Sequence, residues 1–173
     1  MGTITTALCS TFKQELLNGT HNFGSHTFKL ALIKESPTDN YGADTTNYNI
    51  GGYDNDGGST FTTSTTLAGG NNDEHAEITS PSSNGYTAGG VTLTGASVTL
   101  SSTTAFVDFA DAQFLSATLD SDGCLIYNSS TKGSIAGRAV CVISFGSTQS
   151  SDNGTFTIEM PTASSSAAII RVA

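Results

Sequence analysis

From residue 85 onward, short runs of β-forming residues alternate with clusters of glycine, serine, aspartate and asparagine. Strands that start about every dozen residues, with no helical pattern between them, favour an antiparallel sheet, because parallel strands need long crossover connections. This region therefore predicts a mainly β chain that forms an antiparallel β-sandwich or a jelly-roll-like domain. The seven predicted strands are residues 91–100, 105–109, 113–119, 124–127, 138–145, 155–160 and 168–172.

Two short sequences predict tight hairpin turns between these strands. Residues 120–123 read Asp-Ser-Asp-Gly, and residues 151–154 read Ser-Asp-Asn-Gly. Aspartate, asparagine and glycine accept the left-handed backbone that such turns require, so we expect the chain to reverse direction at both places. The strand residues expected in the core or in an interface are Phe106, Val107, Phe109, Ile126, Val142, Ile143, Phe156, Ile158 and Ile170.

One N-terminal α-helix is predicted within residues 1–19. Apolar residues recur there at every fourth position, as on one face of a helix. Thr5 or Thr6 can cap its start, and Gly19 can end it. We expect a strand at residues 27–33 that packs chiefly on one face, against the helix. The residues of the helical stripe are Ile4, Leu8, Phe12 and Leu16.

Residues 35–84 form a long polar insertion in what we expect to be a single domain over residues 1–173. A segment of this length with few apolar residues is unusual inside a compact domain. It is predicted to be either an excursion from the domain or a loop that contacts a partner. Residues 35–76 are expected to be the most mobile part of the chain.

Charge excludes two classes of partner. The chain has 15 acidic and six basic residues, a net charge of −9, which opposes binding to nucleic acid and to anionic membranes. The longest apolar stretches are about five residues, against the ~20 that cross a bilayer. Only 12% of the residues are charged, whereas serine and threonine number 23 and 27, so the surface is polar mostly without charge.

The cysteines and histidines do not form a recognisable metal motif. Cys9, Cys124 and Cys141 are widely spaced, and the last two lie among apolar neighbours, so we expect buried, unreactive thiols. A metal site that combined Cys9 with histidines is the alternative, but ordinary surface and loop histidines are the preferred interpretation. The three histidines are His21, His26 and His75, the last of which stands beside Glu77.

The acidic residues suggest a calcium loop and a carboxylate pair, and neither pattern is complete. Residues 54–57 read Asp-Asn-Asp-Gly, but the ligands that an EF-hand requires at its first and twelfth positions are missing. A different calcium site is the alternative to a solvated acidic loop. In the other pair, Asp108 is expected to point outward from a strand and Asp111 to start a turn. The calcium candidates are Asp54, Asp56, Asp73 and Glu74.

No catalytic, cofactor-binding or metal-binding residue is predicted, and we expect a protein that is not an enzyme. The sequence has no Gly-x-Ser-x-Gly element for a serine nucleophile, and its glycine-rich residues 85–90 lack the spacing of a nucleotide loop. Their plain interpretation is a turn that enters a strand. Glycan binding by ring stacking is the remaining alternative, because the chain has no tryptophan but has tyrosines at Tyr41, Tyr48, Tyr53 and Tyr86.

Several stretches together resemble a family of small structural proteins encoded by tailed bacteriophages. They cover residues 8–33 and 77–173, and the intervening insertion is longer than the family pattern. Their motifs are turns and strand starts, which nominate no functional residue. The stretches are LLNG at 16–19, HNF at 21–23, TFKLAL at 27–32, GYTAGGVTL at 85–93, VDFAD at 107–111, LIYN at 125–128, FG at 145–146, GTFTI at 154–158 and AIIR at 168–171.

The resemblance implies a virion component that is made in the cytoplasm of a bacterial host. Many proteins of this kind are similar to capsid decoration, or cement, proteins, which bind the major capsid protein on the capsid exterior and reinforce the head. A homo-oligomer such as a trimer is expected on the same ground. A tail, baseplate or head–tail connector protein, or a host-glycan-binding module of the virion, are the alternatives that remain open.

Overall fold

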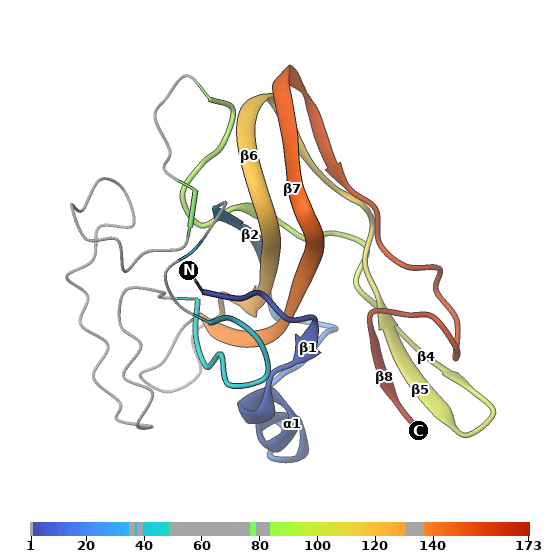
Figure 1. Ribbon diagram of the computed structural model, residues 1–173. Helices are drawn as coiled ribbons and strands as arrows, with labels where there is room; N and C mark the ends of the chain where they lie inside the picture. The colour runs from blue at the N-terminus through green and yellow to red at the C-terminus, as the bar shows by residue number, and fades with distance from the viewer. Residues whose placement is uncertain (1, 35–36, 38–39, 49–76, 79–83, 131–136) are drawn as a thin grey trace.

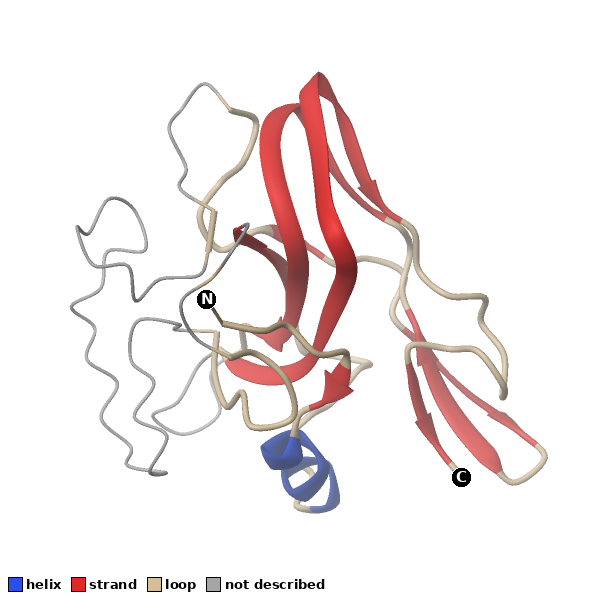
Figure 2. Cartoon of the chain, viewed as in Figure 1, coloured by secondary structure: helices blue, strands red, loops and turns tan. Residues whose placement is uncertain are grey.

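The computed structural model describes residues 2–34, 37, 40–48, 77–78, 84–130 and 137–173. These residues form two antiparallel sheets and one helix (Figure 1, Figure 2). The predicted fold class is confirmed, because the protein is mainly β with a sandwich-like arrangement and one N-terminal helix. None of the described helical residues forms a helix long and apolar enough to cross a membrane.

The larger sheet has five strands in the order β1-β7-β6-β2-β3, and the smaller sheet has three in the order β4-β5-β8. In the larger sheet the bounds are Ala7–Leu8 (β1), Arg138–Ile158 (β7), Ala112–Asn128 (β6), Phe28–Lys34 (β2) and Val91–Thr92 (β3). In the smaller sheet they are Ser97–Ser101 (β4), Thr104–Asp108 (β5) and Ile170–Val172 (β8). The strand predicted at residues 91–100 is therefore two strands in different sheets.

The two predicted hairpin turns are wrong. Residues 120–123 lie inside β6 and residues 151–154 lie inside β7, and these two strands pair antiparallel along their whole length, from Ala112 opposite Ile158 to Asn128 opposite Arg138. Their register shifts at four places, which is how a ladder absorbs extra residues as β-bulges. Bulges increase the local bend, and Figure 1 shows the paired strands folding over at the top of the view. The turn-forming residues therefore bend two continuous strands instead of ending them.

The predicted helix is shorter than its apolar stripe. The helix α1 spans Ser10–Leu17, and Cys9 occupies the N-cap position without a side-chain hydrogen bond, so neither Thr5 nor Thr6 is the cap. The preceding residues are extended, because Ala7 and Leu8 pair with the edge of β7 and gain backbone hydrogen bonds there. Pairing with a sheet edge thus overrides a helical pattern at the start of the chain.

The end of α1 is as predicted. Gly19 has a φ of +67°, its N–H donates to the Leu16 carbonyl at 3.1 Å, and the Thr20 N–H donates to the Glu15 carbonyl at 2.8 Å. These two bonds form a Schellman motif, which satisfies carbonyl groups that the end of a helix leaves open.

Strand β2 is buried on both faces, not chiefly on one. Leu30 and Leu32 point to one face and Ala31 and Ile33 to the other, and all four are fully buried. The strand lies between β6 and β3 in the sheet, although its pairing with β3 covers only two of its residues. This makes β2 an interior strand of the larger sheet, next to its β3 edge.

The core contains the residues that were expected there. Eight of the nine are buried, and Ile143 is partly buried and packs against them. An aromatic cluster of Phe12, Phe23, Phe28 and Phe109 joins α1 to the sheet, with Phe23 and Phe28 stacked at 4.5 Å between ring centroids.

The cysteines are also buried and free, as predicted. Burial raises the pKa of the Cys9 thiol to about 12 and that of Cys141 well above its ordinary value. Thiols with raised pKa values stay protonated, so they are poor nucleophiles and poor metal ligands.

Part of the polar insertion packs on the domain. Residues 40–48 run beside the N-terminus, where Thr5 donates to the Tyr41 carbonyl at 2.8 Å, and Tyr41 and Thr45 are buried. Residues 49–76 lie outside the described residues, so the predicted mobility of residues 35–76 stays a prediction.

The turn at residues 85–90 enters β3, as its sequence indicates, and its last glycine is sterically required. Gly90 has a φ of +68°, and a Cβ atom there would lie 1.8 Å from the Leu30 carbonyl oxygen in β2. Gly19 has nearly the same φ, but a Cβ atom there would have nothing within 4 Å. The two glycines therefore separate the cost of a left-handed backbone from the cost of a clash.

We expect Gly90→Ala to destabilise the protein more than Gly19→Ala. Gly19→Ala is the control and should lose about 1–2 kcal/mol of stability, because alanine disfavours the left-handed backbone. Gly90→Ala should lose a further ~1–3 kcal/mol of stability, because β2 must move to make room for the methyl group. Urea denaturation of both variants measures the difference. Equal losses of stability in the two variants would show that a methyl group at residue 90 does not clash with β2.

Candidate functional site

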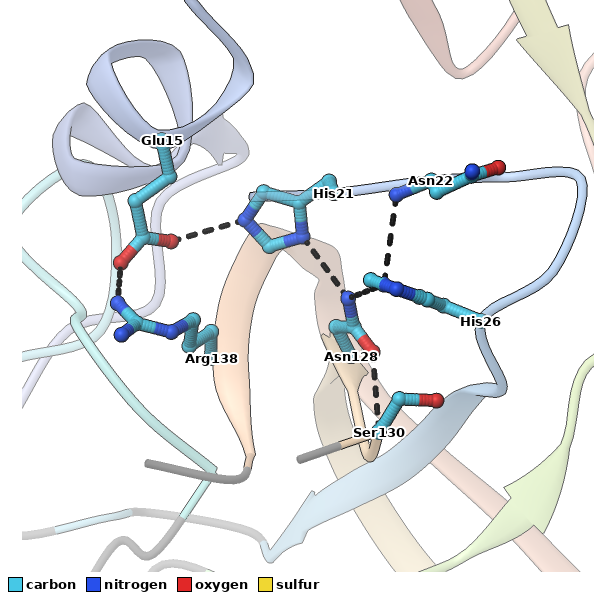
Figure 3. Close-up of polar contacts among 7 residues, drawn as sticks. All are labelled: Glu15, His21, Asn22, His26, Asn128, Ser130 and Arg138. Atoms are coloured by element: carbon cyan, nitrogen blue, oxygen red, sulfur yellow. Dashed lines mark hydrogen bonds and ion pairs between the residues drawn. The ribbon is translucent and has the colours of Figure 1, made fainter. Parts of the chain in front are cut away.

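Four parts of the molecule qualify as candidate sites: a polar cluster at the foot of the sheet, a buried glutamate, the exposed surface of the smaller sheet, and a groove in the bend of β7. The first contains two of the predicted histidines. In it, the Glu15 side chain from α1 accepts from His21 Nε2 at 2.8 Å and from the Arg138 guanidinium of β7 (Figure 3). These contacts tie the helix to the start of β7.

His21 lies in the loop after α1, as the preferred interpretation allowed, but it is buried and not at the surface. Its ring packs against the edge of Phe12 at 4.9 Å between centroids, which excludes water from one side. The Asn128 side-chain amide contacts His21 Nδ1 at 3.2 Å and His26 Nδ1 at 2.9 Å (Figure 3). Ser130 donates its backbone N–H to Asn128 Oδ1 at 3.0 Å, which orients the amide with its NH₂ group toward both rings.

The orientation of Asn128 determines what the cluster can do. An NH₂ group donates, so both Nδ1 atoms accept, and His21 carries its proton on Nε2 and donates it to Glu15. Both nitrogens of His21 are then occupied, which leaves no lone pair for a metal ion. Within the described residues, no group of three or more histidines, cysteines, aspartates or glutamates could hold one. The cluster therefore connects elements of the fold.

Glu77 forms a second polar centre, which the sequence did not indicate. Its side chain is 1% exposed, and its Oε1 accepts from the Tyr86 hydroxyl at 2.6 Å and from the Gly89 N–H at 2.7 Å. Its Oε2 accepts from the Tyr48 hydroxyl at 3.0 Å. The Tyr86 hydroxyl also accepts from the Leu32 N–H at 3.1 Å, which connects this centre to β2.

The environment of Glu77 opposes its charge. Burial raises the pKa of Glu77, while the hydrogen bonds from Tyr86, Gly89 and Tyr48 and the charge of Lys29 act in the opposite direction. The same burial raises the pKa values of Tyr48 and Tyr86, with a further contribution from Glu77 itself. The tyrosines thus remain hydrogen-bond donors, and the centre fastens the chain around residue 77 to the sheet.

The tyrosines offered for glycan stacking are mostly unavailable. Tyr41 and Tyr86 are buried, and the ring of Tyr48 stacks on that of Tyr127 at 4.1 Å between centroids. Tyr53 lies outside the described residues. Rings that are already covered cannot offer a face to a sugar.

The predicted acidic residues are not brought together in the described part of the chain. Asp111 is exposed and accepts from the Met160 N–H at 2.8 Å. Asp108 is half-buried instead of pointing outward, and its Oδ1 has no hydrogen-bond partner among the described residues. His75 and the calcium candidates Asp54, Asp56, Asp73 and Glu74 lie outside the described residues.

The smaller sheet presents an unusual surface. We call β4, β5 and β8 the apolar arm, which lies apart from the larger sheet at the right of Figure 1. Residues directly opposite in a ladder share a face, as do residues two apart in one strand. The register therefore places six apolar residues on one face: Val98, Leu100, Ala105, Val107, Ile170 and Val172.

This face is buried at one part and bare at another. Val107 and Ile170 are 6% and 2% exposed, whereas Leu100, Val98 and Val172 are 71%, 61% and 53% exposed. Exposed apolar residues in isolation are ordinary, but adjacent ones on a sheet face are typical of a surface that contacts another protein.

An apolar groove lies in the bend of β7. Its volume is about 600 Å³, and residues from both halves of the bent strand line it together with the segment that leads to β8. Phe145 before the bend and Phe156 after it approach within 6.3 Å between ring centroids. Its main apolar side chains are Ile143, Phe145, Phe156, Met160 and Ile169, and Glu159 stands at its side.

Comparisons of this chain with protein-family models, with curated proteins and with solved structures found no match.

The buried glutamate gives a pH prediction. The pKa of Glu77 is raised in the folded state above its ordinary value of 4.5. The stability that the protonated Glu77 side chain contributes is therefore fully present below pH 4.5 and is lost as the pH rises through the folded-state pKa. The Glu77→Gln variant cannot ionise there. Between the unfolded-state and the folded-state pKa of Glu77, the wild type loses stability as pH rises and the Glu77→Gln variant does not. The free energy of unfolding of Glu77→Gln should therefore rise, relative to that of the wild type, by about 1.4 kcal/mol per pH unit.

Urea denaturation of both proteins at a series of pH values measures this gain. Glu159→Gln is the matched control, because it removes one carboxylate from the surface and reports the effect of net charge alone. A constant difference between Glu77→Gln and wild type at all pH values would contradict the prediction.

Proposed function

We propose that this chain is a non-enzymatic structural protein of a tailed-bacteriophage virion, and that it acts as a capsid decoration protein that binds the major capsid protein on the head exterior. The observation that carries the proposal is the bare apolar face of the arm. A folded domain that keeps Val98, Leu100 and Val172 in water gains stability when another protein covers them, at about 1.5–3 kcal/mol for each fully buried side chain.

The composition supports a role in a packed assembly. Long charged side chains lose the most rotamer freedom when a surface is immobilised, and this chain has only six lysines and arginines. A surface rich in serine and threonine therefore meets its neighbours at a lower entropic cost. The resemblance to phage structural proteins indicates which assembly this is.

The polar centres of the structure support the same role. Glu15, His21 and Glu77 are used in contacts between elements of the fold, and among the described residues none of their hydrogen bonds goes to a serine or cysteine side chain. The observation that disfavours a glycan-binding module is the burial of Tyr41 and Tyr86. A tail, baseplate or connector protein is the second candidate, because the apolar arm would serve equally there.

The location of the protein in purified particles tests the proposal. A decoration protein is expected on the order of tens to hundreds of copies per particle, as a repeated density on the outer face of the capsid in electron micrograph reconstructions. Quantitative mass spectrometry against the major capsid protein gives the copy number. Recovery of only a few copies, or density at the tail, would assign it to the second candidate, and its absence from particles would refute a virion role.

A further inference from the structure

We infer that the cluster of His21, His26 and Asn128 is a pH-sensitive clasp between the loop after α1 and the end of β6. The clasp is closed while both histidines are neutral, and it opens when they take up protons. Figure 3 shows the Asn128 amide between the two rings, where it holds the loop against the strand. A clasp of this kind is a property of the single subunit, whatever surface the protein docks on.

Two backbone N–H groups fix which atoms of the clasp accept hydrogen bonds. The Asn22 N–H donates to His26 Nδ1 at 3.4 Å, and the Ser130 N–H donates to Asn128 Oδ1 at 3.0 Å. A backbone N–H can only donate, so both of these side-chain atoms are acceptors. The other end of the Asn128 amide, its NH₂ group, is therefore the part that faces both rings.

The closed clasp accommodates neutral histidines only. Asn128 Nδ2 lies 3.2 Å from His21 Nδ1 and 2.9 Å from His26 Nδ1, so its two hydrogens are shared between the two rings. A protonated imidazole carries a hydrogen on each ring nitrogen, and neither Nδ1 could then accept. A protonated His26 would direct an N–H at two donors, the Asn128 NH₂ group and the Asn22 N–H. Proton uptake by His26 thus turns two hydrogen bonds into two repulsive contacts.

Rotation of the Asn128 amide does not remove this conflict. A rotated amide would turn Oδ1 toward the rings, where it could accept from a protonated histidine. Its NH₂ group would then face the Ser130 N–H, and two donors would again oppose one another. Asn128 is 2% exposed, so a donor that loses its partner there is left buried and unsatisfied. The clasp therefore opens instead of rearranging in place.

The charged groups beside the rings do not compensate for the conflict. The Glu15 carboxylate of α1 accepts from His21 Nε2 at 2.8 Å, which alone would favour a protonated ring. The other oxygen of Glu15 pairs with the Arg138 guanidinium of β7, so the charge beside His21 is balanced. His26 has no ion-pair partner among the described residues. The donor contacts at the two Nδ1 atoms therefore decide the protonation state of the closed clasp.

Opening of the clasp frees only the tip of the loop. On one side of the tip, Phe23 is stacked on Phe28 in the core. On the other side, the Ser129 N–H donates to the Thr27 carbonyl at 2.9 Å, a bond that contains no ionisable group. Residues 24–26 lie between these two anchors, and none of them is buried. We therefore expect His26 to move into water with residues 24 and 25 while α1 and β2 stay in place.

Nitrogen NMR of the histidine rings in the full chain tests the closed state. At about pH 8, His21 and His26 should each show a protonated Nε2 and an unprotonated Nδ1. On acidification to about pH 5, below the ordinary titration of histidine, the backbone amide signals of residues 24–26 should shift while that of Ser129 stays in place. A protonated Nδ1 on His26 at pH 8 would overturn the inference, because the Asn22 N–H would then face a donor.

Urea denaturation of His26→Asn tests the dependence on pH. Each variant is compared with the wild type at the same pH, so the contributions of Glu77 and of the other carboxylates cancel. Asparagine keeps an acceptor near the place of Nδ1 but takes up no proton. Below about pH 6.5, where a free histidine titrates, the unfolding equilibrium constant of His26→Asn should fall relative to that of the wild type by up to about tenfold per pH unit.

Asn128→Asp should reverse the preference of the clasp. A carboxylate at residue 128 still accepts from the Ser130 N–H, and it also accepts from protonated rings. This variant should therefore be less stable than the wild type at about pH 8, and it should gain on the wild type more steeply than His26→Asn does as the pH falls. Asn153→Asp is the matched control, because it adds the same charge at an exposed residue of β7 outside the clasp. Its difference from the wild type should stay constant.

Constant differences from the wild type for both His26→Asn and Asn128→Asp over this pH range would also overturn the inference, since the two histidines would then be fixed parts of the fold. His26→Asn is sufficient for this decision if Asn128→Asp does not fold. His26 is half-buried and lies outside the hydrophobic core, so its replacement leaves the core intact.

Discussion

The antiparallel pairing of β6 with β7 is the constraint on which the rest of the structure depends. These strands cover Ala112–Asn128 and Arg138–Ile158, and β2 and β1 attach to their two outer edges. Their bulges bend the pair, and the bend creates the groove in which Phe145 approaches Phe156. The preceding strand β5 and the following strand β8 meet to form the arm. Both candidate contact surfaces are thus consequences of one long, bent ladder.

Two buried polar centres fix the remaining chain on this ladder. The Glu15–His21–Asn128 cluster attaches α1 and its loop to the lower end of β6, and the Glu77 centre attaches residues 77, 86 and 89 to β2. Removing one partner from such a centre leaves a buried group unsatisfied, which costs more than the bond contributes. These centres therefore specify one arrangement of segments that are distant in the sequence, and the apolar core alone would specify it less tightly.

Local sequence patterns were enough to predict the β class, the buried cysteines, the end of α1 at Gly19 and most of the core. The reason is that the alternation of apolar and polar residues and the placement of glycines act over only a few residues. Local patterns were not enough for the turns, since Asp-Gly and Asn-Gly sequences serve equally as bulges when a long partner strand lies alongside. Residues 4–8 have helical spacing but pair with β7, which only the tertiary fold reveals. The burial of His21 and Glu77 and the exposure of Leu100 also depend on which segments meet, so no local sequence pattern predicts them.

The arm is built from segments made at different times. Strands β4 and β5 precede the long ladder in the sequence and β8 follows it, and Val172 completes the row that Leu100 and Ala105 begin. During synthesis, the face that we assign to assembly is therefore incomplete until β6 and β7 have been made and β8 has returned to β5. A nascent or half-folded chain lacks the full face, so the face is complete only in a subunit whose central ladder is already closed.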